Sequence, residues 1–145
     1  MLKMQKQPSL LVVSARLENK KALLRILEDL AVNLPLNTIT ASTVAQAQEV
    51  LAQQPISVIF CEERLPDGPY HELLALATAK GTADPIQFIV MLCTGEWKEY
   101  LEALRLGAAD VVRCPLRPTD VELALIHAVR EETASQPPQT LRATA

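Results

Sequence analysis

The sequence predicts an α/β protein in which helices cover both faces of a doubly wound, five-stranded parallel sheet, giving three α/β/α layers. Five short runs with strand-like composition alternate with longer segments in which leucine and alanine recur at helical spacing. The runs at residues 9–14, 56–61 and 86–92 are largely continuously apolar, as expected of parallel strands that are buried on both faces. With 145 residues, the chain is long enough for one domain with a sizeable core.

The predicted elements alternate along the chain. The five strands are expected at residues 9–14, 36–41, 56–61, 86–92 and 110–113. The five helices are expected at residues 17–34, from a cap at 42 or 43 to 53, and at 70–79, 97–106 and 120–132. Residues 65–69 (LPDGP) carry the signals of a loop.

Side chains at several helix ends support this assignment. Ser42 or Thr43 can cap the second helix, with Gln46 near the position that closes a capping box. Gly107 follows the fourth helix in the place that a C-cap glycine prefers, and Thr119 can cap the last helix. We therefore expect one domain over residues 1–132. Residues 133–145, with two adjacent prolines and little apolar content, are expected to form a flexible tail or linker.

Composition excludes several classes of function. A net charge of −3 and an aromatic content of 3% argue against direct nucleic-acid binding. Only four glycines are present, so a glycine-rich phosphate loop is not expected. The apolar runs are too short for a membrane span, and we expect a cytoplasmic protein without a membrane contact. Three cysteines without a CxxC pair suit neither a disulfide framework nor a zinc site.

In a sheet of this kind, ligands bind beyond the carboxyl ends of the strands. At one of these ends, residues 58–68 (VIFCEERLPDG) resemble the third strand and following loop of response-regulator receiver domains. Residues 107–116 (GAADVVRCPL) resemble the Gly-Ala-x-Asp run that leads into Lys-Pro-Phe in the same family. The resemblance covers about residues 9–132. It implies the flavodoxin-like strand order 2-1-3-4-5 and a role in bacterial two-component or phosphorelay signalling.

The positions that carry the chemistry of that family hold other residue types here. They are Glu62 in place of the phosphoacceptor aspartate, Ser14 and Ala15 in place of the acidic pair that holds Mg²⁺, Cys93 in place of Thr or Ser (with Thr94 one residue later), Cys114 in place of Lys, and Val111 in place of the switch aromatic. The resemblance therefore implies a degenerate receiver, or pseudo-receiver.

Transfer of a phosphoryl group to a carboxylate needs a metal and a cation to stabilise the gathered negative charge. Without carboxylates at Ser14 and Ala15, and without an ammonium at position 114, we expect no metal, no cofactor and no ordinary phosphorylation cycle. For Glu62, three interpretations remain open. It is a hydrated carboxylate or one paired with Arg64 or Arg113, a permanent imitation of a phosphoryl group, or a site of residual phosphorylation.

The leading functional prediction is a signalling module that is not an enzyme and that binds a protein partner or a second copy of itself. In receiver domains the fourth helix, fifth strand and fifth helix commonly form that contact, and we expect one or both of Trp97 and Leu101 to project outward there. The alternative is a small redox sensor or enzyme. It would use Cys93 and Cys114, because adjacent strand ends are expected to bring these two residues together. Two small residues that refill a vacated pocket are the simpler interpretation of the same pair.

Overall fold

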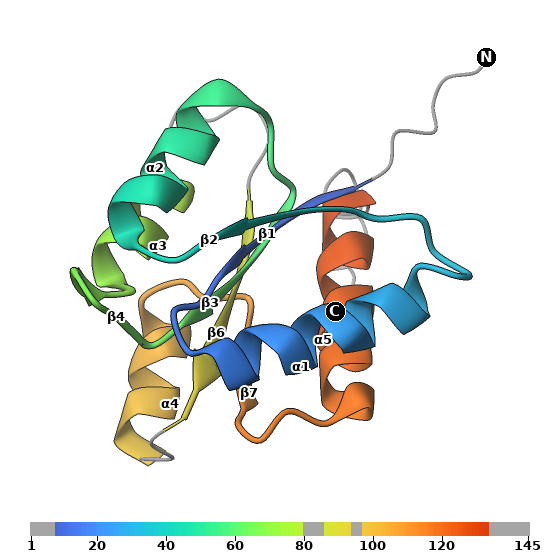
Figure 1. Ribbon diagram of the computed structural model, residues 1–145. Coiled ribbons are helices and arrows are strands. Elements are labelled where there is room, and N and C mark those ends of the chain that lie inside the picture. Colours follow the sequence, from blue (N-terminus) through green and yellow to red (C-terminus); the bar gives the residue numbers. More distant parts are fainter. Residues whose placement is uncertain (1–7, 80–85, 94–96, 134–145) are drawn as a thin grey trace, which may run out of the picture.

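In the computed structural model, which describes residues 8–79, 86–93 and 97–133, five parallel strands form a central sheet between two layers of helices (Figure 1). The elements follow in the order β1 (Ser9–Val13), α1 (Leu17–Leu30), β2 (Asn37–Ala41), α2 (Val44–Gln53), β3 (Val58–Glu62), β4 (Arg64–Leu65), β5 (Gly68–Pro69), α3 (His71–Ala77), β6 (Gln87–Leu92), α4 (Trp97–Arg105), β7 (Asp110–Arg113) and α5 (Pro118–Thr133). The α/β class and the parallel sheet agree with the sequence analysis.

The main sheet has the strand order β2-β1-β3-β6-β7. The predicted order 2-1-3-4-5 differs from it in its numbers, because the sequence analysis assigned only a loop to the segment after β3. That segment contains a short antiparallel hairpin in which Arg64 pairs with Pro69 and Leu65 with Gly68. Leu65 is buried, and Gly68 has a φ of +145°, a backbone conformation that favours glycine. The hairpin takes two strand numbers, and the five parallel strands keep the flavodoxin-like arrangement.

Four strands, β1, β3, β6 and β7, contribute to two apolar cores because successive side chains point to opposite faces of the sheet. Leu10 and Val12 of β1 face α1 and α5, whereas Leu11 and Val13 face α2, α3 and α4. Figure 1 shows the same division, with α1 and α5 on one side of the sheet. We call these two sides the α1/α5 face and the α2–α4 face.

Two predicted helix boundaries are wrong. The first helix ends at Leu30 rather than at residue 34, because the amides of Val32 and Asn33 bond to carbonyls three residues back and form a turn. The last helix begins at Pro118, so Thr119 lies inside it rather than capping it. Proline is well tolerated at the first position of a helix, where its missing N–H has no intrahelical partner.

Other predicted helix ends are confirmed. The Thr43 side chain accepts a hydrogen bond from the Gln46 amide at 3.1 Å, and the Gln46 side chain accepts one from the Ser42 amide at 2.7 Å. Gly107 has a φ of +115° directly after α4. Within the part of the chain that the structure describes, none of the helices has the length and apolar character needed to cross a membrane. The domain assignment to residues 1–132 stays a prediction, and of the expected tail all but Thr133 lies outside the described residues.

Asp67 in the turn between β4 and β5 holds that turn against the start of α2. Its carboxylate accepts hydrogen bonds from the amides of Val44 at 2.9 Å and Ala45 at 3.1 Å. These are two of the amides at a helix N-terminus that have no partner within the helix. The bond from Val44, followed by that from Ala45, lowers the pKa of Asp67 below its ordinary value of 3.8. The LPDG segment therefore joins two parts of the chain that lie 23 residues apart.

We expect Asp67→Ala to lower the melting temperature by about 2–4 °C at pH 7, the shift typical of a lost helix cap in a domain of this size. Because the pKa of Asp67 is lowered in the folded state, its contribution is complete above pH 3.8 and is lost as the pH falls through the folded-state pKa. The difference between the two proteins should therefore shrink in acid. Thermal denaturation between pH 7 and pH 3 measures this. Glu49→Ala, an exposed carboxylate farther along α2, is the control. A difference that stays constant with pH would contradict the assignment.

Candidate functional site

Four of the residues singled out in the sequence stand in a row across the carboxyl edge of the sheet. Each lies two positions beyond a buried residue of the α1/α5 face, and side chains two positions apart point to the same face of a strand. In strand order, the row consists of Ser14 after β1, Glu62 at the end of β3, Cys93 after β6 and Cys114 after β7. The strands thus bring together residues that are up to 100 positions apart in the sequence.

Glu62 is buried, with an exposed fraction of only 2%. Its carboxylate accepts hydrogen bonds from the Ser14 hydroxyl at 2.6 Å, from the Ala15 amide at 3.2 Å and from the Asn19 side chain at 3.2 Å. Among the described side chains, none has a buried polar atom without a partner. The expectation of a hydrated carboxylate or of an ion pair with Arg64 or Arg113 is wrong, because the side chain turns inward to the β1–α1 connection.

Two of the three donors to Glu62, Ser14 and Ala15, stand where the resemblance puts the metal-binding acids. Ser14 supplies a hydroxyl and Ala15 a backbone amide, and neither residue supplies a carboxylate. Mg²⁺ requires near-octahedral oxygen coordination, which these two residues do not supply. Within residues 8–79, 86–93 and 97–133, no group of three or more His, Cys, Asp and Glu side chains is placed to hold a metal ion. The residues present therefore do not fit a magnesium site.

Asn19, in the first two turns of α1, extends the hydrogen-bonded row to the cysteines. Its side-chain nitrogen lies 3.2 Å from a carboxylate oxygen of Glu62 and 3.2 Å from the sulfur of Cys93. The amide of Cys114 donates to the carbonyl of Leu92 at 2.9 Å, which sets Cys114 beside Cys93 at the ends of neighbouring strands. The prediction that these two strand ends come close is confirmed.

Burial raises the pKa of the Cys114 thiol well above its ordinary range. The hydrogen bond with Cys93 and the negative charges of Cys93, Glu62 and Glu63 act in the same direction. Burial raises the pKa of Cys61 as well, and that side chain lies on the α2–α4 face, away from the row. Cys61 and Cys114 thus remain protonated thiols at neutral pH.

A small cavity of about 60 Å³ opens beside the row. It is lined by Arg16, Glu62, Glu63, Arg64 and Cys93. The carboxylate of Glu63 accepts a hydrogen bond from the Cys93 amide, which fixes the end of β6 against the loop after β3.

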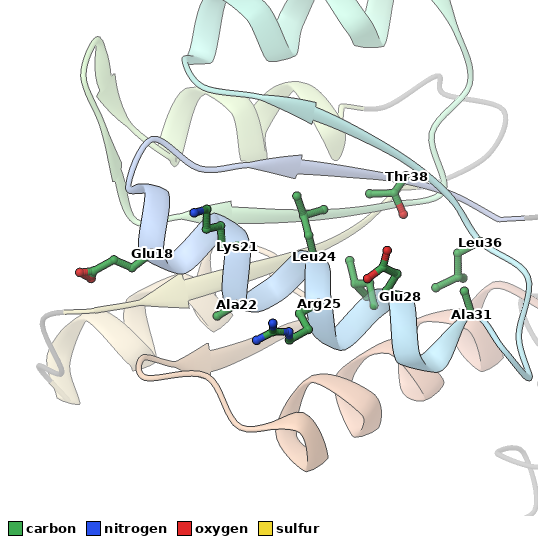
Figure 2. Close-up of a pocket in the computed structure, with 10 residues that line it drawn as sticks. Glu18, Lys21, Ala22, Leu24, Arg25, Glu28, Ala31, Leu36 and Thr38 are labelled. Carbon is green, nitrogen blue, oxygen red and sulfur yellow. The ribbon is translucent and has the colours of Figure 1, made fainter.

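A larger groove of about 890 Å³ lies elsewhere, along the outer side of α1 and the edge strand β2. Figure 2 shows Leu24, Leu36 and Thr38 between these two elements, with Lys21 and Arg25 along the helix. None of the row residues lines this groove, so its size alone does not mark it as the functional site.

The remaining candidates lie near α4 and β7. Val111 is buried and lines a cavity of about 280 Å³ together with Tyr100 of α4 and Leu123 of α5. Trp97 and Leu101 project outward as predicted, with exposed fractions of 62% and 48%. Thr94 lies outside the described residues.

Sequence reasoning missed Asn19 and Glu63. Asn19 was detectable in principle, because the first turns of a helix that follows a parallel strand lie over the carboxyl edge of the sheet. A polar residue at that point is a natural member of the site. Glu63 offered no signal, because the partner of its side chain is a backbone amide 30 residues away.

Comparison with known proteins agrees with this architecture, although no family model matches the chain. The response regulator protein PilR of Pseudomonas aeruginosa is 26% identical over 113 residues, which are 78% of this chain and 24% of PilR. The chain thus spans about a quarter of the length of that relative.

Solved structures resemble the chain over most of its length. A response regulator receiver domain protein from Clostridium thermocellum has a TM-score of 0.76 at 17% identity, covering 89% of this chain and 99% of that one. A two-component response regulator from Clostridium difficile gives 0.72 at 21%, covering 86% and 97%. The beryllofluoride-activated NtrC4 receiver domain dimer gives 0.74 at 22%, covering 86% and 98%. The chain therefore has the fold of response-regulator receiver domains.

We expect Ser14→Ala to lower the free energy of unfolding by about 1.5–3 kcal/mol, the usual worth of a hydrogen bond to a charged group. Urea denaturation at pH 7 measures this. Ser42→Ala is the control, because the Ser42 hydroxyl only accepts a bond from Lys20 at 3.1 Å, where a cost below about 1 kcal/mol is expected. In a double-mutant cycle, Ser14→Ala and Glu62→Gln should be non-additive. Additive effects would show that the two side chains do not act together.

Proposed function

We propose that this chain is a receiver-like signalling module of the two-component type. It acts in the bacterial cytoplasm, without an aspartyl-phosphate cycle and without enzymatic activity, by binding another protein or a second copy of itself. The observation that carries this proposal is the hydrogen-bonded carboxylate of Glu62 in a site that supplies neither metal ligands nor a lysine.

Phosphorylation of a carboxylate requires an oxygen atom that can attack the donor. The carboxylate of Glu62 is 2% exposed, and both of its oxygens accept hydrogen bonds. Attack by a Glu62 oxygen would require breaking its 2.6 Å hydrogen bond with the Ser14 hydroxyl. It would also require moving the buried carboxylate away from its donors and into contact with the phosphodonor. At the other end of the row, the resemblance to receiver domains implies a lysine whose ammonium contacts the phosphoryl group. This chain has the protonated thiol of Cys114 at that position. Each of these features opposes phosphoryl transfer.

Permanent imitation of a phosphoryl group is less well supported. For such imitation, residues at the ends of β6 and β7 would have to form hydrogen bonds or ion pairs with the Glu62 carboxylate. Receiver domains place the groups that contact the phosphoryl oxygens at these strand ends. Within the described residues, the donors to Glu62 instead come from the β1–α1 connection and from α1. We therefore interpret Glu62 as a structural carboxylate that holds the β1–α1 connection.

Incubation with Mg²⁺ and a small phosphodonor should leave the intact mass unchanged. We expect no increase by one phosphoryl group after times that fully phosphorylate an ordinary receiver domain, which serves as the positive control. The reason is the lack of metal ligands at Ser14 and Ala15. A stoichiometric adduct that disappears in Glu62→Gln would overturn the proposal.

The surface best suited to a protein contact is the α4–β7–α5 face. Four of its apolar side chains are exposed, namely Trp97, Leu101 and Leu104 of α4 and Leu123 of α5. The ring of Trp97 stacks on that of Tyr100 with centroids 4.9 Å apart, and Tyr100 lines the cavity next to Val111. Through Tyr100, Trp97 thus connects to the cavity between α4, β7 and α5.

Both signs of charge occur on this face, because Asp110, Arg113 and Asp120 line the same cavity. In a two-fold symmetric contact, the same patch of both subunits meets itself, so a patch with both charges can be self-complementary. The match to a receiver domain solved as a dimer is in keeping with this arrangement. We therefore take a second copy of the chain as the occupant to be tested first.

We expect sedimentation velocity over a concentration series to show reversible self-association. Leu101→Glu should weaken it at least tenfold, which corresponds to about 1.4 kcal/mol, because a charge would enter the centre of the contact. Leu76→Glu, on α3 and similarly exposed at 47%, is the matched control and should leave association unchanged. A monomer at all concentrations, or equal effects of both variants, would contradict this use of the face.

A further inference from the structure

Cys93 and Cys114 stand opposite each other on neighbouring parallel strands. In the ladder between β6 and β7, Leu92 pairs with Arg113. The amide of Cys114 donates to the carbonyl of Leu92 at 2.9 Å, which continues this register by one residue and places Cys93 opposite Cys114. Both side chains belong to the row on the α1/α5 face.

This register allows a covalent bond between the two sulfurs. Neighbouring strands lie about 4.8 Å apart, which is within the range of about 4.4–6.8 Å that joins the Cα atoms of disulfide-bonded cysteines. The backbone bond between Cys114 and Leu92 holds the two strand ends in this register. No large movement of the backbone is needed to bring the sulfurs together.

The two thiols differ in their surroundings, and the difference gives them separate roles. Cys93 lines the cavity of about 60 Å³, which has room for a molecule the size of hydrogen peroxide, and its sulfur accepts a hydrogen bond from Asn19 at 3.2 Å. Cys114 does not line this cavity. Cys93 is therefore the sulfur that a peroxide in the cavity meets first, and Cys114 is the one that resolves the product.

We propose that Cys93 and Cys114 form a reversible disulfide when a hydroperoxide enters the cavity beside Cys93. The thiolate of Cys93 attacks one peroxide oxygen, so an S–O bond forms and the O–O bond breaks. The other oxygen leaves with a proton as water or an alcohol. The sulfur of Cys114 then attacks the sulfenic acid on Cys93, an S–S bond forms, and the hydroxyl leaves as water with the Cys114 proton. The two thiols are oxidised by two electrons and the peroxide is reduced by two.

The position of the pair also predicts that the bond is easily reduced. Cys93 lines the cavity, so a reductant can reach the bond by the same route as the peroxide. Disulfides at exposed positions are among the readily reduced ones. This property goes beyond the proposed signalling role and does not depend on it.

The test is intact-mass spectrometry of the whole chain after treatment with hydrogen peroxide at pH 7. We expect the wild type to lose the mass of two hydrogen atoms, to give a peptide that joins the segments around Cys93 and Cys114, and to regain the lost mass in dithiothreitol. Cys61→Ala is the matched control, because Cys61 is buried on the opposite face, and it should behave like the wild type.

The variants Cys93→Ser and Cys114→Ser separate the two roles. Neither should lose two hydrogen atoms, and Cys114→Ser should accumulate a sulfenic acid on Cys93 that dimedone traps. Circular dichroism and a thermal melt establish that each variant is folded. An unchanged wild-type mass, oxidation of Cys93 to sulfinic acid without a disulfide, or a disulfide that includes Cys61 would each overturn the proposal.

Discussion

The buried carboxylate of Glu62 is the constraint on which the rest of the site depends. A buried charge without partners is strongly destabilising, so the chain must supply donors from its own residues. It supplies the Ser14 hydroxyl, the Ala15 amide and the Asn19 side chain, all from β1 and the start of α1. A metal ion would fill the same electrostatic need if carboxylates stood at positions 14 and 15. Here direct hydrogen bonds stabilise the Glu62 carboxylate, so it has partners without a bound cation.

The fold was largely predictable from the sequence, because it depends on local signals. Continuous apolar runs marked the strands, Gly107 marked the end of α4, and the pattern of Thr43 and Gln46 marked the start of α2. The site was predictable only as a set of positions. The rotamer of Glu62 decides whether its carboxylate meets water, an arginine or Ser14, and no local signal determines that choice. The bonds from Asp67 to α2 and from Glu63 to Cys93 are missing from the prediction for the same reason: each joins distant segments in the folded state alone.

The chain has a receiver fold at low sequence identity. Solved receiver structures with 14–22% identity superpose on most of its length, so the core tolerates wide change as long as the apolar pattern is kept. The carboxyl edge of the sheet is different, because the resemblance to receiver domains implies chemical roles for its positions. Under the function proposed above, Ser14 and Cys114 at this edge would keep the packing and would not support phosphoryl transfer. Function must therefore be argued from this edge and not from the fold.

A module of this kind needs another source of conformational bias if it is to switch. A ligand shifts an equilibrium only through a difference in its affinity for the two states, and a carboxylate that is always satisfied supplies no such difference. Two of the proposals made above would supply it. A partner bound to the α4–β7–α5 face would favour a state in which Trp97 and Leu101 are exposed. Oxidation of the thiol pair would favour a state in which the ends of β6 and β7 are covalently joined. Trp97 begins α4 four residues after Cys93, so the two proposed sites lie close together in the sequence.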